Sequence, residues 1–468
     1  MRLVTDLRPH QVKPVERMLP TRVGGLFMDM GTGKTRTALE VIARRQRRID
    51  RVVWFCPVFF KETIEGEVSK HCAEVTVAVF NDKTTVRRLP DAFFVVVGLE
   101  SMSLSRRVIL AVNAMVTDRT FVVVDESDKI KGFFAQRTKW LIEIGKRARF
   151  RMVLTGTPLS QGVTDLFAQM YFLSPRILGY TSWYAFERNH IEYSDRFPGM
   201  IRRVHNVEYL AAKVAPYVYQ VTKEECLDLP EKLYETRYFW MTGDQQDAYQ
   251  RAKWDTLFNI QSYDNFDQLA IFRLFTALQA VASGYYTSNK DGWFTELLHH
   301  RRTSTLLSIL EDIPAGEKVI IWGKFQKDMA DIVRVQVENY GPEAVAQYHG
   351  RFNERRRNQE LARFRRDARF LVGTPTAGGR GLTVVEAAYC VFYNNSFKYS
   401  ERLQAEDRVH RIGQTRAVTY FDIVMRDSID EKIMDALWAK GNVLSSFREE
   451  VSKVRHSKKS LKKLIMSL

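Results

Sequence analysis

Short apolar runs alternate with stretches of helical periodicity through most of this sequence. Four runs lie in the first half, at 51–55, 93–97, 120–124 and 150–154, and four in the second half, at 318–322, 369–373, 390–394 and 419–424. Strands that are covered on both faces are apolar at nearly every position, so these runs predict parallel β-sheets flanked by crossover helices. The two series of strands predict an α/β protein with two lobes in tandem.

A segment of different character lies between the two series. Residues 163–300 are rich in Tyr, Phe and Trp and mostly helical in pattern, and the clearest helix is at 244–258. We place the lobe boundary near Asp228-Leu229-Pro230, where a proline ends a helix-like run. The predicted parts are a first lobe at 1–228 with a helical insertion at about 163–215, a second lobe at 229–445 with a helical insertion at about 243–300, and a basic tail at 446–468.

Composition and charge narrow the class of protein. Hydrophobic residues make up 45% of the 468 positions and charged residues 27%, which is typical of a folded globular chain and excludes disorder as its main state. The formal net charge of +16 indicates polyanionic partners. Four scattered cysteines form no CxxC pair, and no apolar run is long enough to span a membrane. The N-terminus also lacks the apolar core of a signal peptide, so we expect a soluble intracellular protein.

The strongest local motif is the glycine-containing segment at 28–45. Its central residues are Gly31, Thr32, Gly33, Lys34 and Thr35. An apolar strand precedes them and a helical pattern follows, which predicts a phosphate-binding loop because backbone N–H groups and a helix N-terminus attract anions. Lys34 would reach the β- and γ-phosphates of a nucleotide, and Thr35 would bind Mg²⁺. Met28 departs from the usual GxxxxGK[ST] pattern, which has glycine at that position.

Two adjacent carboxylates, Asp125 and Glu126, follow the apolar run at 120–124. An Asp-Glu pair alone is weak evidence, since such pairs usually lie in solvated loops. Downstream of a phosphate loop and directly after a buried strand, the pair predicts the remaining groups that nucleotide hydrolysis needs. Asp125 would hold Mg²⁺ through water, and Glu126 would orient and deprotonate the attacking water.

The second lobe carries a glycine-rich turn at 373–383 and a charged segment at 404–414. Gly379 and Gly381 would let the turn approach a nucleotide or a nucleic-acid backbone closely. In the charged segment, helical spacing would place Gln404, Arg408 and Arg411 on one face. Two arginines there fit an arginine-finger role, with an exposed, salt-bridged helix as the alternative.

The order and spacing of these motifs resemble helicase superfamily two, and within it the stand-alone bacterial or viral type of Swi/Snf-related ATPase. The similarity extends over about residues 7–440, and the sequence DRVHRIGQ at 407–414 is its most specific part. The matching segments are 7–11 (adenine-reading motif), 30–35 (motif I), 125–131 (motif II), 154–161 (motif III), 376–383 (motif V) and 404–414 (motif VI). Besides Met28, two departures are Asp128, where motif II usually has His, and Arg380, where motif V is usually apolar.

The resemblance implies a two-lobed RecA-like motor that hydrolyses ATP with Mg²⁺ in the interlobe cleft and translocates on double-stranded DNA. The catalytic residues that it implies are Lys34, Glu126, Arg408 and Arg411, with Thr35 and Asp125 holding the metal. The nucleotide would be bound by Gln11 as adenine reader and by Gly31, Thr32, Gly33, Lys34, Thr35, Asp125, Gly379, Gly381, Gln404 and Asp407. Remodelling of DNA or protein–DNA complexes is the expected outcome of such a motor.

Contacts to DNA are expected at phosphates, which give affinity with little sequence specificity. The candidates are Lys61, Arg355, Arg356, Arg357 and Arg380, each with a solvated surface position as the alternative. Forked DNA is a further candidate substrate, and any protein partner is unknown. Two other functions stay open, a strand-separating helicase or restriction-type motor and a catalytically silent DNA-binding protein. The resemblance favours the cytoplasm of a bacterial or phage-infected cell, or the nucleus if the source is eukaryotic.

Overall fold

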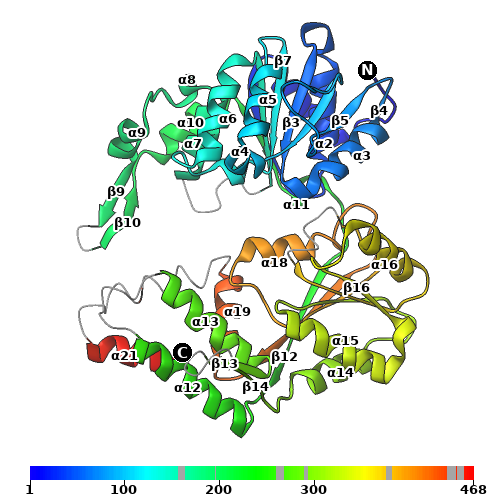
Figure 1. Cartoon of the computed structure of the whole chain (residues 1–468), viewed down its shortest axis with the longest axis vertical. Coiled ribbons are helices and arrows are strands. Elements are labelled where there is room, and N and C mark those ends of the chain that lie inside the picture. Colours follow the sequence, from blue (N-terminus) through cyan, green and yellow to red (C-terminus); the bar gives the residue numbers. More distant parts are fainter. Residues whose placement is uncertain are drawn as a thin grey trace. The chain divides into compact units, whose positions relative to one another are not determined.

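The chain forms two compact units, Met1–Asp228 and Leu229–Leu468, in a computed structural model (Figure 1). The structure describes residues 1–156, 164–194, 197–259, 268–288, 294–375, 382–439, 450 and 458–468. Among these residues, no helix has both the length and the apolar character needed to cross a membrane. All four cysteines are free, and Cys56, Cys72 and Cys390 are buried.

A seven-stranded sheet forms the centre of the first unit, in the order β11-β2-β8-β7-β3-β6-β5. Every neighbouring pair is parallel, as the apolar runs predicted. The strands are β2 (Val23–Met28), β3 (Arg51–Cys56), β5 (Val77–Val79), β6 (Phe94–Gly98), β7 (Thr120–Asp125), β8 (Phe150–Thr155) and β11 (Val218–Val221). The edge strands β5 and β11 were not among the predicted runs, because they are short and only partly buried.

Alternate residues of this sheet contribute to two separate apolar clusters. Trp54 lies in one cluster with α1, α2 and α3, whereas Val53 and Phe55 lie in the other with α5, α6 and α7. Both faces of the sheet are therefore covered, which explains why its central strands are largely apolar. The helices are α1 (Pro9–Met18), α2 (Lys34–Ala43), α3 (Lys61–His71), α4 (Ser101–Leu104), α5 (Arg106–Met115), α6 (Gln136–Arg147) and α7 (Thr164–Leu173), with short 3₁₀ turns η1 (Gln46–Arg48), η2 (Val58–Phe60) and η3 (Ser127–Ile130).

The predicted helical insertion of the first unit also contains a β-hairpin. Its elements are α8 (Pro175–Leu178), α9 (Trp183–His190), the antiparallel strands β9 (Ile191–Ser194) and β10 (Phe197–Val204), and α10 (Val207–Val214). Figure 1 shows the hairpin projecting from these helices. Phe167, Trp183 and Phe186 pack against one another, so the aromatic residues of this region contribute to the core. A second small pair joins β1 (Arg2–Leu3) to β4 (Cys72–Ala73), and α11 (Lys223–Cys226) ends the unit.

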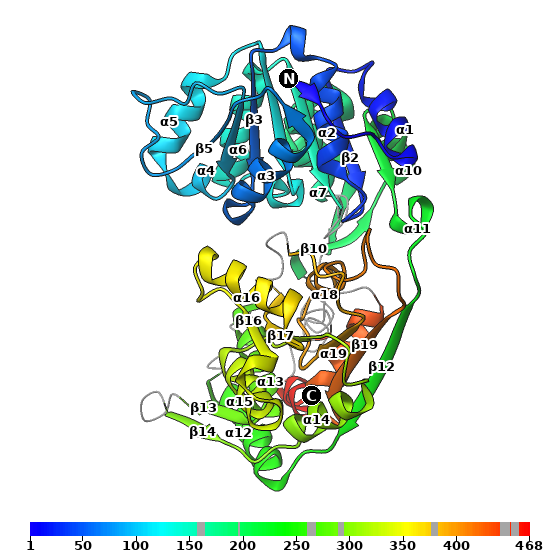
Figure 2. The same cartoon turned by 90° about the vertical axis from the view of Figure 1, so that its right-hand side faces the viewer.

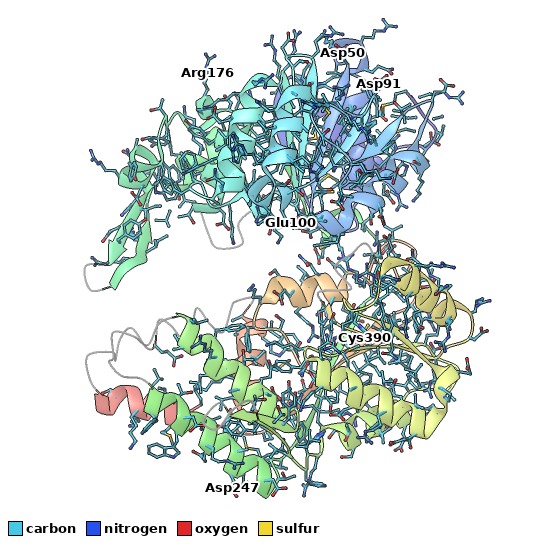
Figure 3. The ribbon with its side chains drawn as sticks, viewed as in Figure 1. Asp50, Asp91, Glu100, Arg176, Asp247 and Cys390 are labelled. Carbon is cyan, nitrogen blue, oxygen red and sulfur yellow. The ribbon has the colours of Figure 1, made fainter. Side chains whose placement is uncertain are left out.

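The second unit contains a six-stranded parallel sheet, in the order β12-β19-β18-β15-β17-β16. Its strands are β12 (Lys232–Phe239), β15 (Val319–Trp322), β16 (Val345–Tyr348), β17 (Phe370–Gly373), β18 (Tyr389–Phe392) and β19 (Val418–Met425). Cys390 (labelled in Figure 3) and Trp322 belong to the cluster on one face, and Ile321 belongs to the cluster on the other. The predicted α/β class with two parallel sheets is therefore confirmed.

Helices flank this second sheet as well. They are α12 (Gly243–Asn259), α13 (Gln268–Ala282), α14 (Arg302–Asp312), α15 (Gln326–Tyr340), α16 (Glu354–Arg366), α18 (Tyr399–Glu406), α19 (Ile429–Trp438) and α21 (Lys458–Met466), with the 3₁₀ turn η5 (Pro342–Ala344) and the hairpin β13 (Tyr285–Ser288)–β14 (Phe294–Leu297). The described end of the basic tail is a helix with a buried apolar side. This helix lies within the second unit (Figure 2). Ile465 and Leu468 lie in the core, and Lys253 Nζ donates to the Met466 carbonyl at 3.0 Å.

Candidate functional site

The predicted phosphate loop connects β2 to α2 in the first unit. Gly31 and Gly33 have φ angles of 83° and 87°, in the left-handed region that favours glycine. Lys34 is the first residue of α2, and its Nζ donates to the carbonyls of Met28 at 2.8 Å and Asp29 at 3.3 Å. The loop is thus closed around a lysine ammonium at a helix N-terminus, which is the arrangement that binds phosphate in proteins.

Gln11, the predicted adenine reader, contacts the same loop from α1. It is 2% exposed, and its Nε2 donates to the Gly33 carbonyl at 3.0 Å while its Oε1 accepts from the Arg8 amide at 2.9 Å. His10 Nε2 donates to the Thr32 carbonyl at 2.8 Å. Sequence reasoning had not selected His10, whose only signal is its place next to Gln11. Both side chains therefore connect the N-terminal helix to the phosphate loop.

The two carboxylates lie at the end of β7, on the same sheet edge as the loop. Asp125 pairs with Leu154 of β8, and Phe27 of β2 pairs with Thr155, so the ends of β2 and β7 flank the end of β8. Burial and the Glu126 carboxylate raise the pKa of Asp125, and the charge of Lys34 opposes this rise. Glu126 has a φ of 50°, an uncommon conformation for a residue other than glycine. Such strained backbone is found most often at functional sites.

The turn after these carboxylates is fixed by a buried hydrogen bond. Ser127 Oγ donates to Gln169 Oε1 of α7 at 2.7 Å, and both side chains are fully buried. Asp128, which replaces the usual histidine, accepts from Lys129 Nζ at 2.9 Å. Thr155 of the predicted motif III is buried at the end of β8, whereas the rest of that motif from 157 onward lies outside the described residues.

The structure corrects the prediction for the charged segment of the second unit. Helix α18 ends at Glu406, so Gln404 lies in its last turn while Arg408 and Arg411 lie in the turns that follow. These residues therefore do not share a helical face. The exposed, salt-bridged helix is also wrong, because Asp407 and Arg408 are only 5% and 4% exposed. The helical spacing was misleading because the chain turns at Asp407 and again at Gly413, whose φ is 103°.

The turns after α18 hold the arginines in different surroundings. Arg408 is buried, whereas Arg411 is partly exposed and its Nη1 donates to Thr383 Oγ1 at 2.7 Å. Gln414 Nε2 donates to the carbonyls of Val385 at 3.2 Å and Ala387 at 2.8 Å, which fixes the end of the segment. Gly379, Arg380 and Gly381 lie outside the described residues.

The predicted DNA contacts lie in two places. Arg355, Arg356 and Arg357 are in the first turn of α16, where the first two are exposed and Arg356 lies 3.8 Å over the Phe352 ring. Lys61 begins α3, and its Nζ donates to the Phe80 carbonyl at 2.7 Å. The arginines thus present charge to solvent, while the Lys61 ammonium has a backbone acceptor.

Comparison with known proteins places these motifs in a family context. A model of the SNF2-related domain matches residues 10–290, and one of the helicase conserved C-terminal domain matches residues 301–413. An uncharacterized ATP-dependent helicase, MG018 of Mycoplasma genitalium, is 24% identical over 92% of this chain and 41% of its own length. The TATA-binding protein-associated factor MOT1 of Saccharomyces cerevisiae is 25% identical over 90% of this chain and 26% of its own length. The chain thus spans less than half the length of these relatives.

Among solved structures, the SWI2/SNF2 ATPase core of Sulfolobus solfataricus in complex with dsDNA aligns with 99% of this chain and 97% of its own. The TM-score is 0.44 and the sequence identity is 22%.

Proposed function

Because the chain belongs to the SNF2-related family, we propose that it is an ATP-dependent motor that translocates on double-stranded DNA and remodels DNA or protein–DNA complexes. One observation carries the proposal. The phosphate loop, with Lys34 and Gln11, lies at the same sheet edge as Asp125 and Glu126. In parallel α/β sheets, ligands bind beyond the carboxyl ends of the strands, which is where these groups lie.

The loop residues fit the phosphates of ATP. Within the described residues, no side chain caps the N-terminus of α2, so its positive end is open to an anion. Lys34 would exchange the carbonyls of Met28 and Asp29 for phosphate oxygens, and Gly31 and Gly33 keep the backbone close to them. Gln11 can also read a base, because its amide oxygen accepts one hydrogen bond, from the Arg8 amide, and can accept another.

The carboxylates fit a magnesium ion and an attacking water. Mg²⁺ is usually bound by one or two protein oxygens together with substrate phosphates, so Thr35 and Asp125 suffice. Burial and the Glu126 carboxylate raise the pKa of Asp125, and a bound cation would stabilise its negative charge. When bound, Mg²⁺ would neutralise charge on the phosphates. Glu126 would then orient the water and accept its proton.

The second unit would contribute positive charge to the transferred phosphoryl group. Arg411 suits an arginine finger because it is partly exposed, whereas the buried Arg408 would hold the segment in place and contribute a longer-range charge. Gln404 and Asp407 would position the same segment, and Gly379 and Gly381 would line the nucleotide. These assignments follow the family motif residue by residue.

Double-stranded DNA is the partner that we propose, bound through its phosphates by Arg355, Arg356 and Arg357, with Lys61 and Arg380 as further contacts. The exposed arginines in the first turn of α16 support this part of the proposal. We also propose that the protein acts on forked DNA and that it works in the cytoplasm of a bacterial or phage-infected cell. A strand-separating helicase or restriction-type motor is the alternative. A silent DNA-binding protein is disfavoured, since Lys34, Asp125 and Glu126 are all present.

Steady-state ATP hydrolysis tests this function directly. The rate is measured without DNA and with single-stranded, blunt double-stranded and forked DNA, and Lys34→Ala serves as the inactive control. Strong stimulation by blunt duplex is the expected result. Stimulation by single strands alone would favour the strand-separating helicase, and stimulation by forks alone would restrict the substrate to junctions. An absence of turnover under all conditions would refute the motor.

A further inference from the structure

The segment that leads from the first unit to the second is hydrogen-bonded, where it leaves the first unit, to the phosphate loop. In the first unit, the Asp29 amide donates to the Val221 carbonyl at 3.1 Å, and Asp29 Oδ2 accepts from the Lys223 amide at 3.0 Å. Asp29 precedes Gly31 in the phosphate loop, and Lys223 begins α11. The segment that leaves this unit is therefore hydrogen-bonded directly to Asp29.

Helix α11 lies between these contacts and the end of the first unit at Asp228. It begins with a capping box in which the Thr222 amide donates to Glu225 Oε2 at 2.7 Å, and it ends where the Leu227 amide donates to the Lys223 carbonyl at 2.8 Å. A capping box satisfies two backbone donors at the start of a helix reciprocally. Asp29 is thus connected to Leu227 through two hydrogen bonds, one from the Lys223 amide and one to the Lys223 carbonyl.

Motif VI holds the other end of the connection in the second unit. His410 is 8% exposed, and its Nε2 donates to the Pro230 carbonyl at 2.7 Å. Glu406 Oε2 accepts from both Lys232 Nζ and Tyr234 Oη at 2.9 Å, just beyond Pro230 on the chain.

Glu406 is itself fixed by buried charge. Arg402 Nε donates to Glu406 Oε1 at 2.8 Å, and Arg402 also forms an ion pair with Asp422 of β19. Burial acts to raise the pKa of Glu406, but the charges of Arg402 and Lys232 outweigh it and hold that pKa below its usual value. Glu406 is thus a charged, firmly placed acceptor for the start of β12.

We infer that the connection at 227–231 is a short mechanical link between the phosphate loop and motif VI, and that Asp29, Glu406 and His410 are the positioning residues that attach it. Only Asp228 and Leu229 separate the attached residues Leu227 and Pro230. The three Cα–Cα steps from Leu227 to Pro230 span at most about 11 Å, so this connection is short. Nucleotide binding at the loop would therefore be transmitted to the segment that carries Arg411. This inference rests on the proposed ATPase function.

Lengthening the link tests the inference. Four residues, Gly-Ser-Gly-Ser, are inserted between Asp228 and Leu229, and the matched control carries the same insertion after Gly316, in an open turn within the second unit where an added Cβ would meet nothing. Binding of a fluorescent ATP analogue and duplex-stimulated turnover are measured for both. We expect the link insertion to lower kcat by about fivefold or more and to leave the affinity for the analogue unchanged. Fivefold is the lower end of the range in which one site affects another. The control should resemble wild type.

His410→Ala, made in both the wild-type chain and the chain with the insertion, distinguishes loss of the proposed coupling from a general loss of structure. His410→Ala should lower kcat in the wild-type chain but have no further effect in the chain with the lengthened link, because the same path is already broken. His410→Gln, which keeps a donor for the Pro230 carbonyl, should restore part of the loss. Equal losses from His410→Ala in both chains, or a link insertion with wild-type kcat, would overturn the inference. If the wild-type chain itself hydrolyses no ATP, the proposed function fails instead.

Discussion

Gly33→Ala isolates the contact between the phosphate loop and Gln11. Gly33 has a φ of 87°, and an added Cβ would lie 2.2 Å from Gln11 Nε2 and 3.4 Å from its Cδ. The Gln11 side chain would have to leave its place, because real Cβ contacts of 2.2 Å do not occur. The substitution thus strains the backbone and removes the hydrogen bond from Gln11 to the Gly33 carbonyl.

The expected loss of ATP affinity follows from the backbone strain and the lost hydrogen bond. A residue other than glycine in the left-handed region costs about 1–2 kcal/mol, and loss of one hydrogen bond costs about 1 kcal/mol. The free loop can relax, whereas the phosphate-bound loop must adopt the native conformation, so the full penalty of about 2–3 kcal/mol enters the binding free energy. ATP affinity should fall about 30- to 150-fold, at 1.4 kcal/mol for each factor of ten.

Titration with a fluorescent ATP analogue measures this loss. The matched control is Gly179→Ala, which has the same backbone strain at a φ of 80° but meets no atom within 4 Å and lies outside the loop. It should reduce thermal stability without changing analogue affinity. In a Gln11→Ala background only the backbone strain remains, so Gly33→Ala should then cost about 1–2 kcal/mol. Wild-type affinity for Gly33→Ala alone would refute the reasoning.

Three further predictions concern other residues. Arg411→Ala should lower duplex-stimulated kcat by about 10³-fold with far less effect on nucleotide affinity, as for other arginine fingers, and an equal loss in both would make it a binding residue. Charge reversal at Arg355–Arg357 should flatten the plot of log affinity for duplex against log salt by about 0.9 for each lost phosphate contact; an unchanged slope would place these arginines away from DNA. Asp328 is 1% exposed, and burial raises its pKa to about 6, against hydrogen bonds from Asn394 and the Phe325 amide. Because the pKa in the folded protein exceeds the unfolded value of 3.8, the stability that protonated Asp328 contributes is complete below pH 3.8 and is lost as pH rises through about 6. Asp328→Asn should therefore stabilise the second unit by up to about 3 kcal/mol at pH 8 and by nothing at pH 3.5. Urea titration followed by hydrogen exchange of β15 measures this gain, and a gain independent of pH would contradict the assignment.

The central strands of both sheets could be predicted because burial on two faces leaves a continuous apolar run, as in β3 and β18. The edge strand β12 was missed for the opposite reason. Its sequence, KLYETRYF, is largely polar or aromatic and partly exposed, and only its pairing with β19 makes it a strand. Intrinsic preference for strands is weak compared with such tertiary pairing.

The candidate site shows the same division. The loop with Lys34 and the pair Asp125-Glu126 could be selected as candidates because glycines, a lysine and carboxylates stand at short spacings next to buried strands. The predicted relationship to Swi/Snf-related ATPases is confirmed by the family match. The single helical face for Gln404, Arg408 and Arg411 was wrong, because spacing alone does not reveal that a helix ends at Glu406.

The sequence by itself therefore determined the two series of buried strands, the candidate phosphate loop and the family, since each depends on short contiguous segments and their order along the chain. Only the tertiary structure decided which backbone groups the side chains of Asp29 and His410 contact. The partners, the Lys223 amide and the Pro230 carbonyl, lie 194 and 180 residues away along the chain. A hydrogen bond to a backbone group places no demand on the partner's side chain, so such pairs leave no pattern in a single sequence.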